Sequence, residues 1–303
     1  MDVTFAHWAG FSLIILIILS LDLYWAFRKP REVGIKEACL HSAGWILLAL
    51  LFNFWIYWRF GSDRSLEFLT GFVIEKSLSI DNLFLFLLIF QRFQVPKETK
   101  YLILFYGVLG AICMRGLLIW AGVTLVNQFQ WIFVLFGLFL IITGIRLLWK
   151  KESMKSIEQG FVYSWIMKTI PMTGYRGIHF FVKENKTWKG TPLLAALLFI
   201  EFTDLIFALD SVPAILGITT EPFIVFTSNV FAILGLRSLF FALEGMMQRF
   251  GLLHYALAFI LVFIGCKMVL IQYIHIPILM TFAVILVVLS LAILGSFLFP
   301  KKQ

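Results

Sequence analysis

Charged side chains are scarce in this chain of 303 residues: Asp, Glu, Lys and Arg together make up 14% of it, while 61% is hydrophobic. Soluble domains carry about a quarter charged residues, so this composition excludes an ordinary soluble protein. A mean hydropathy of +0.95 agrees with that exclusion. The composition instead predicts an integral membrane protein.

Cysteine is also rare, with three residues far apart in the sequence. The chain has no CxxC pair, no Cys/His cluster and no HExxH motif, the patterns that zinc and thiol redox sites use. The Gly-x-Gly-Asp element of intramembrane aspartyl proteases is absent as well. We therefore expect neither an enzyme nor a resident cofactor.

Apolar residues fall into runs of roughly 20 residues, which at about 1.5 Å per residue cross a hydrocarbon core of about 30 Å. We therefore predict an all-α fold, a polytopic transmembrane helix bundle with about nine spans. The predicted spans are residues 5–27, 39–58, 66–90, 101–125, 129–149, 191–216, 223–247, 252–273 and 276–299.

Basic residues are divided unevenly between the loops that join these spans. Eighteen of the 25 Lys and Arg lie in loops on one side, and only Arg59 and Arg64 lie in loops on the other. Because short cytoplasmic loops are enriched in Lys and Arg, we predict an outer N-terminus and a cytoplasmic C-terminus. This topology and anionic lipid headgroups explain the net charge of +8, so no nucleic-acid partner is expected.

Spans three to five resemble spans six to eight, in that each unit carries two acids six residues apart and then a buried arginine in its next span. The matching residues are Glu75 with Asp204, Asp81 with Asp210, Arg115 with Arg237, and Gly144 with Gly265, at offsets that fall from 129 to 121. A unit of three spans reverses its direction when it is repeated. The copies are therefore predicted to be inverted, as in many secondary transporters.

The predicted organisation is a single transmembrane domain, 1–303, divided by this repeat. Its parts are two N-terminal spans (1–60), the first repeat (61–150), a basic cytoplasmic loop (151–190), the second repeat (191–273) and a C-terminal span (274–303). The loop is expected to be either a solvated, partly interfacial linker or a regulatory segment.

Ionisable side chains inside the spans carry the functional argument, because a charge near the middle of a bilayer costs at least about 2.5 to 3.5 kcal/mol. Five acids lie in spans three and six, four of them at similar depth, and we expect them to meet between the repeats. With three basic companions they would leave two negative charges, the complement of one divalent cation. The predicted metal ligands are Glu75, Asp81, Asn82, Glu201, Asp204, Asp210 and Ser211, with Lys76, Arg115 and Arg237 as supporting charge partners.

The spacing of the acids also predicts which helix faces they occupy. Glu201 and Asp204 are three residues apart and share a face. Asp81 and Asp210 come six residues after their repeat partners and fall on a different face. Either both helices unwind just after these acids, or the two acids contact neighbouring helices instead.

Oxygen donors alone favour hard ions such as Mn²⁺, Mg²⁺ or Ca²⁺ over Zn²⁺ or Cu⁺. Protons compete with a metal for carboxylate oxygens, which provides a route to exchange. An interhelical salt-bridge network that only holds the bundle together is the structural alternative, above all for Arg115 and Arg237. Asp22 and Glu244 lie nearer the cytoplasmic side and are candidates for an access path or for a headgroup contact.

The stretches 75–83 (EKSLSIDNL) and 202–214 (FTDLIFALDSVPA) resemble the two signature stretches of the TerC family, and the resemblance covers nearly the whole chain. The segment 229–239 and the first two spans look most like the Alx-type bacterial members. The resemblance implies a proton-coupled manganese exporter of the bacterial inner membrane, built on inverted repeats and associated with the alkaline pH response. By motif position it implicates Glu75, Asp81, Asn82, Glu201, Asp204, Asp210 and Ser211.

Two classes of function are compatible with these observations. The first is a divalent metal cation transporter, with Mn²⁺ efflux as its leading form. The second is a non-transporting scaffold or assembly factor of a metal or envelope stress-response complex. A transporter needs its buried acids, whereas a scaffold needs its surface or the loop 151–190. The sequence leaves the oligomeric state open.

Overall fold

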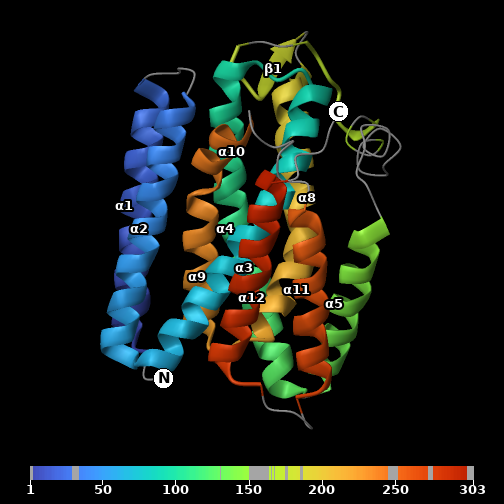
Figure 1. The fold of residues 1–303 in the computed structure, drawn as a ribbon. Helices are drawn as coiled ribbons and strands as arrows, with labels where there is room; N and C mark the ends of the chain where they lie inside the picture. The colour runs from blue at the N-terminus through green and yellow to red at the C-terminus, as the bar shows by residue number, and fades with distance from the viewer. Residues whose placement is uncertain are drawn as a thin grey trace. The chain divides into compact units, whose positions relative to one another are not determined.

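The computed structural model describes residues 3–28, 34–129, 131–149, 164, 166, 168–174, 177–184, 187–244, 252–271 and 276–298. Long helices account for most of this part of the chain (Figure 1). The helices are α1 (Phe5–Arg28), α2 (Ile35–Phe60), α3 (Ser62–Arg92), α4 (Lys97–Gln128), α5 (Ile132–Trp149), α8 (Pro192–Leu216), α9 (Pro222–Leu234), α10 (Leu236–Glu244), α11 (Leu253–Val269) and α12 (Ile278–Leu298).

In the described part of the chain, each predicted span is largely helical, which confirms an all-α helical membrane bundle. Within the described residues, α2, α4, α8, α12 and the segment Pro222–Glu244 are long and apolar enough to cross a membrane. Shorter apolar helices cover Phe5–Leu21, Ile132–Leu148 and Leu253–Val269. The 31-residue helix α3 is long enough, but its apolar run is interrupted by Glu75, Lys76 and Asp81.

The predicted span 223–247 is apolar enough to cross a membrane over Pro222–Glu244, and within these residues it consists of two helices rather than one. Helix α9 ends at Leu234, and α10 begins at Leu236 after Gly235. A Cβ at Gly235 would lie 2.6 Å from Nζ of Lys76 and 3.1 Å from Cβ of Trp45. Two side chains from other helices therefore occupy the space beside the break, and only glycine fits there without moving them.

Part of the predicted linker 151–190 is ordered as a β-hairpin, which the sequence did not suggest. Strand β1 (Phe181–Glu184) pairs antiparallel with β2 (Thr187–Gly190), and Lys183 lies opposite Trp188. The amide of Gly190 donates to the carbonyl of Pro171, so the hairpin is also tied to the preceding chain.

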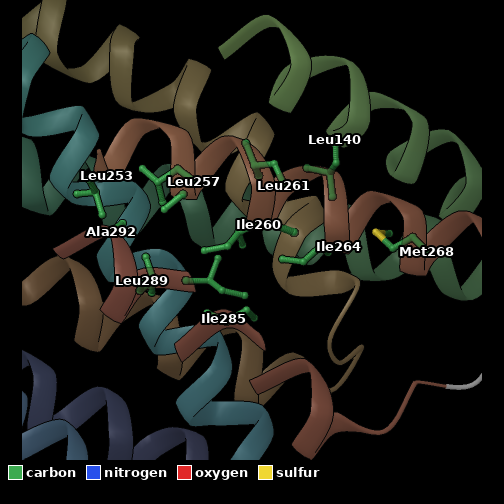
Figure 2. Packing of buried hydrophobic residues seen from close by; sticks show 13 residues of the cluster. Leu140, Leu253, Leu257, Ile260, Leu261, Ile264, Met268, Ile285, Leu289 and Ala292 are labelled. Atoms are coloured by element: carbon green, nitrogen blue, oxygen red, sulfur yellow. The ribbon is translucent and has the colours of Figure 1, made fainter. Parts of the chain in front are cut away.

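Internal contacts divide the chain into two compact units, each made of three segments. The first unit contains Met1–Val33, Leu85–Ala111 and Glu152–Asp204, and the second contains Gly34–Phe84, Ile112–Lys151 and Leu205–Gln303. Helix α11 is central to the core of the second unit, where Leu257, Ile260 and Ile264 are buried (Figure 2). Leu140 of α5 and Ile285 of α12 pack into the same core.

Helices α5 and α11, the third spans of the two predicted repeats, lie side by side in the second unit (Figure 1). A Cβ at Gly144 would lie 2.7 Å from the carbonyl oxygen of Ala258, and one at Gly265 would lie 2.6 Å from that of Gly137. Gly144 corresponds to Gly265 at the repeat offset of 121, and Gly137 corresponds to Ala258. The crossing is therefore reciprocal, as a contact across a two-fold axis is.

Candidate functional site

Glu75 lies in the middle of α3, and its side chain is completely buried. One turn earlier, a Cβ at Gly71 would lie 2.9 Å from Oγ of Ser228, so α3 and α9 approach each other closely there. The absence of a side chain at Gly71 thus brings the polar residues of α9 next to the Glu75 turn.

Arg115 of α4 connects Glu75 to two further helices of the second unit. Its Nη1 forms an ion pair with Oε1 of Glu75, and both side chains are buried. The same nitrogen donates to Oγ of Ser211 at 3.3 Å and to Oδ1 of Asn229 at 3.2 Å. Ser79 donates to Oε1 of Glu75 at 3.4 Å. Four helices, α3, α4, α8 and α9, therefore contribute to one buried polar cluster, which we call the Glu75 cluster.

Asn229 belongs to the Glu75 cluster, although it is not among the site residues that the sequence predicts. Its Nδ2 donates to the carbonyl of Val225 at 2.9 Å within α9, and this fixes Oδ1 as the acceptor for Arg115. Asn229 is completely buried. A neutral amide in an apolar span is itself a sign of a functional or packing role, and that signal was present in the sequence.

One oxygen of Glu75 is satisfied much less well than the other. Oε1 has contacts with Arg115 and Ser79, whereas Oε2 is buried and has no hydrogen-bond partner among the described residues. A buried polar atom without a partner costs about 1 to 3 kcal/mol, and more when it is charged. Such an atom in an otherwise well-packed protein calls for a specific explanation.

The second acid of the second repeat, Asp210, contacts a neighbouring helix. Thr143 of α5 donates to Oδ1 of Asp210 at 3.2 Å. Helix α8 continues through Asp210 and Ser211 to Leu216 with Pro213 inside it, so it does not unwind there. Of the two alternatives for Asp210, a contact with a neighbouring helix is the one that the structure shows.

On α3 the corresponding region is also helical, since the helix runs without a break to Arg92. Asn82 is buried on this helix. The backbone of Asp81 belongs to α3, and its side chain lies outside the described residues.

Lys76 reaches the break between α9 and α10. Its Nζ donates to the carbonyl oxygen of Ala232 at 3.1 Å, in the last turn of α9. The last four carbonyls of a helix lack partners within the helix, and a cation there also complements the helix dipole. Lys76 thus stabilises the end of α9. Arg237 is buried in the first turn of α10, three residues beyond the end of α9.

Glu201 and Asp204 belong to the first unit. A Cβ at Gly110 of α4 would overlap the carboxylate of Glu201, so this carboxylate lies directly against α4. Asp204 is buried. The two acids are three residues apart on a continuous helix, as the shared face requires.

The two candidates for an access path lie in α1 and α10. Asp22 is in α1, and its side chain lies outside the described residues. Glu244 is the last residue of α10 and is partly buried. Among the described side chains, no three His, Cys, Asp or Glu residues stand close enough to hold one metal ion. The other oxygens of the Glu75 cluster come from Ser79, Ser211 and Asn229 instead.

Sequence comparisons place these features in a known family. The model of the "Integral membrane protein TerC family" matches residues 60–303. An "Uncharacterized membrane protein" of Myxococcus xanthus is 44% identical over 95% of this chain and 91% of its own length. No solved structure matches the chain.

Two similar relatives, from Salmonella typhi and from Escherichia coli strain K12, are both named "Putative membrane-bound redox modulator Alx". They are 43% and 42% identical over 94% and 92% of this chain, and the matches cover 92% and 90% of their own lengths. The matched region includes the Glu75 cluster and both acidic stretches, 75–83 and 202–214. The chain belongs to the integral membrane protein TerC family and is an Alx-like member of it.

Proposed function

We propose that this protein transports a divalent metal cation, that its physiological substrate is Mn²⁺, and that it exports this ion from the cytoplasm in exchange for protons. The Glu75 cluster is the proposed binding site for this ion within the second unit. The ion is substrate here, so the protein needs no resident cofactor.

The observation that carries this proposal is the state of the Glu75 carboxylate. It is completely buried in the middle of α3, and Oε2 has no hydrogen-bond partner in the described part of the chain. A passing cation would satisfy this oxygen. Ser79 donates to the other oxygen of this carboxylate, and Ser211 and Asn229 accept from the Arg115 nitrogen that binds Glu75. The cluster therefore contains hydroxyl and amide oxygens, which hard divalent ions prefer.

Arg115 has a defined part in this proposal. In the described state its guanidinium neutralises Glu75, so the buried carboxylate never stands without a positive charge. A divalent cation at Oε2 of Glu75 would repel the guanidinium at Oε1, and Ser211 and Asn229 provide alternative acceptors for Nη1. The divalent cation replaces the positive charge of Arg115 beside Glu75. The buried carboxylate is therefore neutralised in both states, which keeps the free energy of each state low.

Two contacts in the second unit support the proposed transporter architecture. The reciprocal crossing of α5 and α11 is the contact that inverted repeats would make at their common axis. Arg64 binds Oε1 of Glu221 at 3.1 Å, which joins the beginnings of α3 and α9, and these are predicted to lie on the same, outer side. With the distribution of basic residues, we propose an outer N-terminus and a cytoplasmic C-terminus in the bacterial inner membrane.

The test is transport by the purified protein in liposomes that contain a Mn²⁺-sensitive dye. We expect Mn²⁺ flux with the native protein and its loss in Glu75→Gln, which keeps the size of the side chain but removes its charge. Glu67→Gln is the matched control, because Glu67 lies on the same helix and binds Arg64 at 2.8 Å, outside the Glu75 cluster. No flux with the native protein, or equal flux in Glu75→Gln, would contradict the proposal.

One observation favours a second function, a non-transporting scaffold: the Glu75–Arg115 ion pair joins helices and has a structural use of its own. A scaffold predicts that Glu75→Gln changes stability but not the cellular phenotype. The redox role in the names of two relatives belongs to those proteins. We propose transport for this chain because the groups of its cluster are carboxylate, hydroxyl and amide oxygens, which exchange no electrons.

A further inference from the structure

The β-hairpin of the first unit has one face that combines aromatic and basic side chains. Strand pairing places Phe181, Lys183 and Trp188 on the same face, since Phe181 and Lys183 alternate along β1 and Trp188 pairs with Lys183. Phe181 is 55% exposed and Trp188 is 65% exposed. Large aromatic side chains with such exposure are unfavourable in water, and this face carries no acidic residue among its described members.

The side chains on the opposite face of the hairpin are mostly polar, and its acidic residue already has hydrogen-bond partners. Glu184 accepts from Nζ of Lys189 at 3.2 Å through Oε2 and from Oγ1 of Thr173 at 3.0 Å through Oε1. The only acid of the two strands is thus neutralised on that face by its neighbours. Lys183 remains as the charge of the aromatic face, which is therefore positive.

The hairpin is held at the end of a membrane-spanning helix. Strand β2 ends at Gly190, and α8 begins two residues later, at Pro192. Thr191 closes this junction, because its amide donates to the carbonyl of Phe180 at 3.0 Å. The ring of Phe180 packs edge-on against Tyr106 of α4, with the centroids 5.4 Å apart. The hairpin cannot move far from the level at which α8 leaves the hydrocarbon.

We infer that the face formed by Phe181, Lys183 and Trp188 lies in the headgroup region of the protein's own membrane, on the cytoplasmic side, and binds anionic phospholipid. Aromatic side chains, Trp above all, are favoured at that depth because their rings are amphipathic. Lys183 adds attraction to the negative surface of the cytoplasmic leaflet. The face with Glu184 and Lys189 is directed to water. This inference does not depend on which substrate the protein transports.

The direct test measures the depth of the two faces in full-length protein in liposomes. A single cysteine replaces either Trp188 or, as the matched control on the opposite face, Thr187 (Trp188→Cys, Thr187→Cys), with Cys39, Cys113 and Cys266 changed to Ala. Each cysteine carries a bimane fluorophore, which is quenched by lipids with a nitroxide on the upper acyl chain or by aqueous iodide.

We expect the lipid nitroxide to quench the label at position 188 at least about twofold more than the label at 187, with the opposite order for iodide. Equal quenching at the two positions, or stronger iodide quenching at 188, would overturn the inference. Stronger iodide quenching at 188 is the result expected if this face is exposed to water and binds a soluble protein instead.

A second measurement needs no cysteine substitution. Hydrogen exchange of the amides of 178–184 and 187–190 is compared in nanodiscs with and without phosphatidylglycerol. We expect anionic lipid to slow exchange in the native protein, and Lys183→Gln to reduce this slowing by about fivefold. Thr187→Ala should retain the native response. Exchange that does not respond to the lipid charge in any of these proteins would contradict the role of Lys183.

Discussion

The second spans of the two predicted repeats carry corresponding arginines in different surroundings. In the first repeat, α4 is continuous through Arg115, and this arginine binds Glu75, Ser211 and Asn229. In the second repeat, the span is interrupted at Gly235, and Arg237 lies in the first turn after the break. The third spans, by contrast, meet in a reciprocal contact at Gly144 and Gly265.

The two repeats share the contact between their third spans and differ in the structure of their second spans. The α5–α11 crossing is common to both copies and sets a frame. The first copy contributes a buried pair of opposite charges between α3 and α4. The second contributes a helix break whose carbonyl end is bound by Lys76. Broken helices in secondary transporters commonly provide ion-binding backbone groups, so the two copies have features suited to different tasks.

Arg115→Ala should have the largest effect, because it breaks the charge pair that distinguishes the first copy. Glu75 would be left buried without its cation, at a cost of about 3 to 5 kcal/mol. The free energy of unfolding in mixed micelles measures this loss, and transport should fail as well. Glu75→Gln/Arg115→Met removes both charges and should recover most of the stability without recovering transport. Full stability in Arg115→Ala would contradict this account of the pair.

Gly144→Ala and Gly265→Ala test the shared frame. Each added methyl group would meet a backbone carbonyl, at 2.7 and 2.6 Å, and a backbone cannot move aside as a side chain can. We expect each to cost about 1 to 3 kcal/mol, as overpacking does. Because the contact is reciprocal, the two costs should agree within about 0.5 kcal/mol. Thermal unfolding in detergent measures both, and clearly unequal costs would refute the two-fold relation.

Gly235→Ala tests the break of the second copy. The methyl group would displace Nζ of Lys76 from the end of α9 and press on Trp45, and the lost hydrogen bond should cost about 1 to 2 kcal/mol. Gly44→Ala on α2 is the matched control, because a Cβ there meets nothing within 4 Å. That substitution should be neutral or stabilising by about 0.5 to 1 kcal/mol. Equal changes in the free energy of unfolding for Gly235→Ala and Gly44→Ala would show that Lys76 and Trp45 do not restrict the residue at position 235.

Thr143→Val should have the smallest effect. It removes the hydrogen bond to Asp210 while keeping the shape of the side chain, at a cost of about 1 kcal/mol. The residue that corresponds to Thr143 at the offset of 121 is Ile264, which cannot donate. Thr143→Val therefore makes the copies more alike. Ion flux in liposomes and the free energy of unfolding are measured on the same variant. A loss of transport without a loss of stability would reveal a direct role for Asp210 in the ion path.

The helices were predictable from the sequence because each apolar run is about as long as a bilayer is thick. The break at Gly235 was not, since glycine is common in membrane helices and the side chains beside it, Lys76 and Trp45, come from distant parts of the chain. The hairpin was missed because its short strands lie in a segment of mixed polarity.

The candidate site was predicted in part. The pattern identified Glu75, Arg115 and Ser211 as buried functional residues, and the structure brings these three together. The sequence pattern did not show which acid Arg115 would bind, because several acids lie at similar depth in their spans. Asn229 was passed over because the search followed charge, although its amide completes the same cluster. Ligation of a metal by the seven predicted residues stays a prediction.

The central claim is that a divalent cation binds Glu75 in place of Arg115. An experimental structure with bound Mn²⁺ tests it most directly, with the native protein and Glu75→Gln prepared alike. We predict Mn²⁺ at about 2.0 to 2.6 Å from a carboxylate oxygen of Glu75, with Arg115 turned to Ser211 and Asn229, and no ion there in Glu75→Gln. An intact Glu75–Arg115 pair under saturating Mn²⁺, with the ion absent or bound elsewhere, would contradict the account.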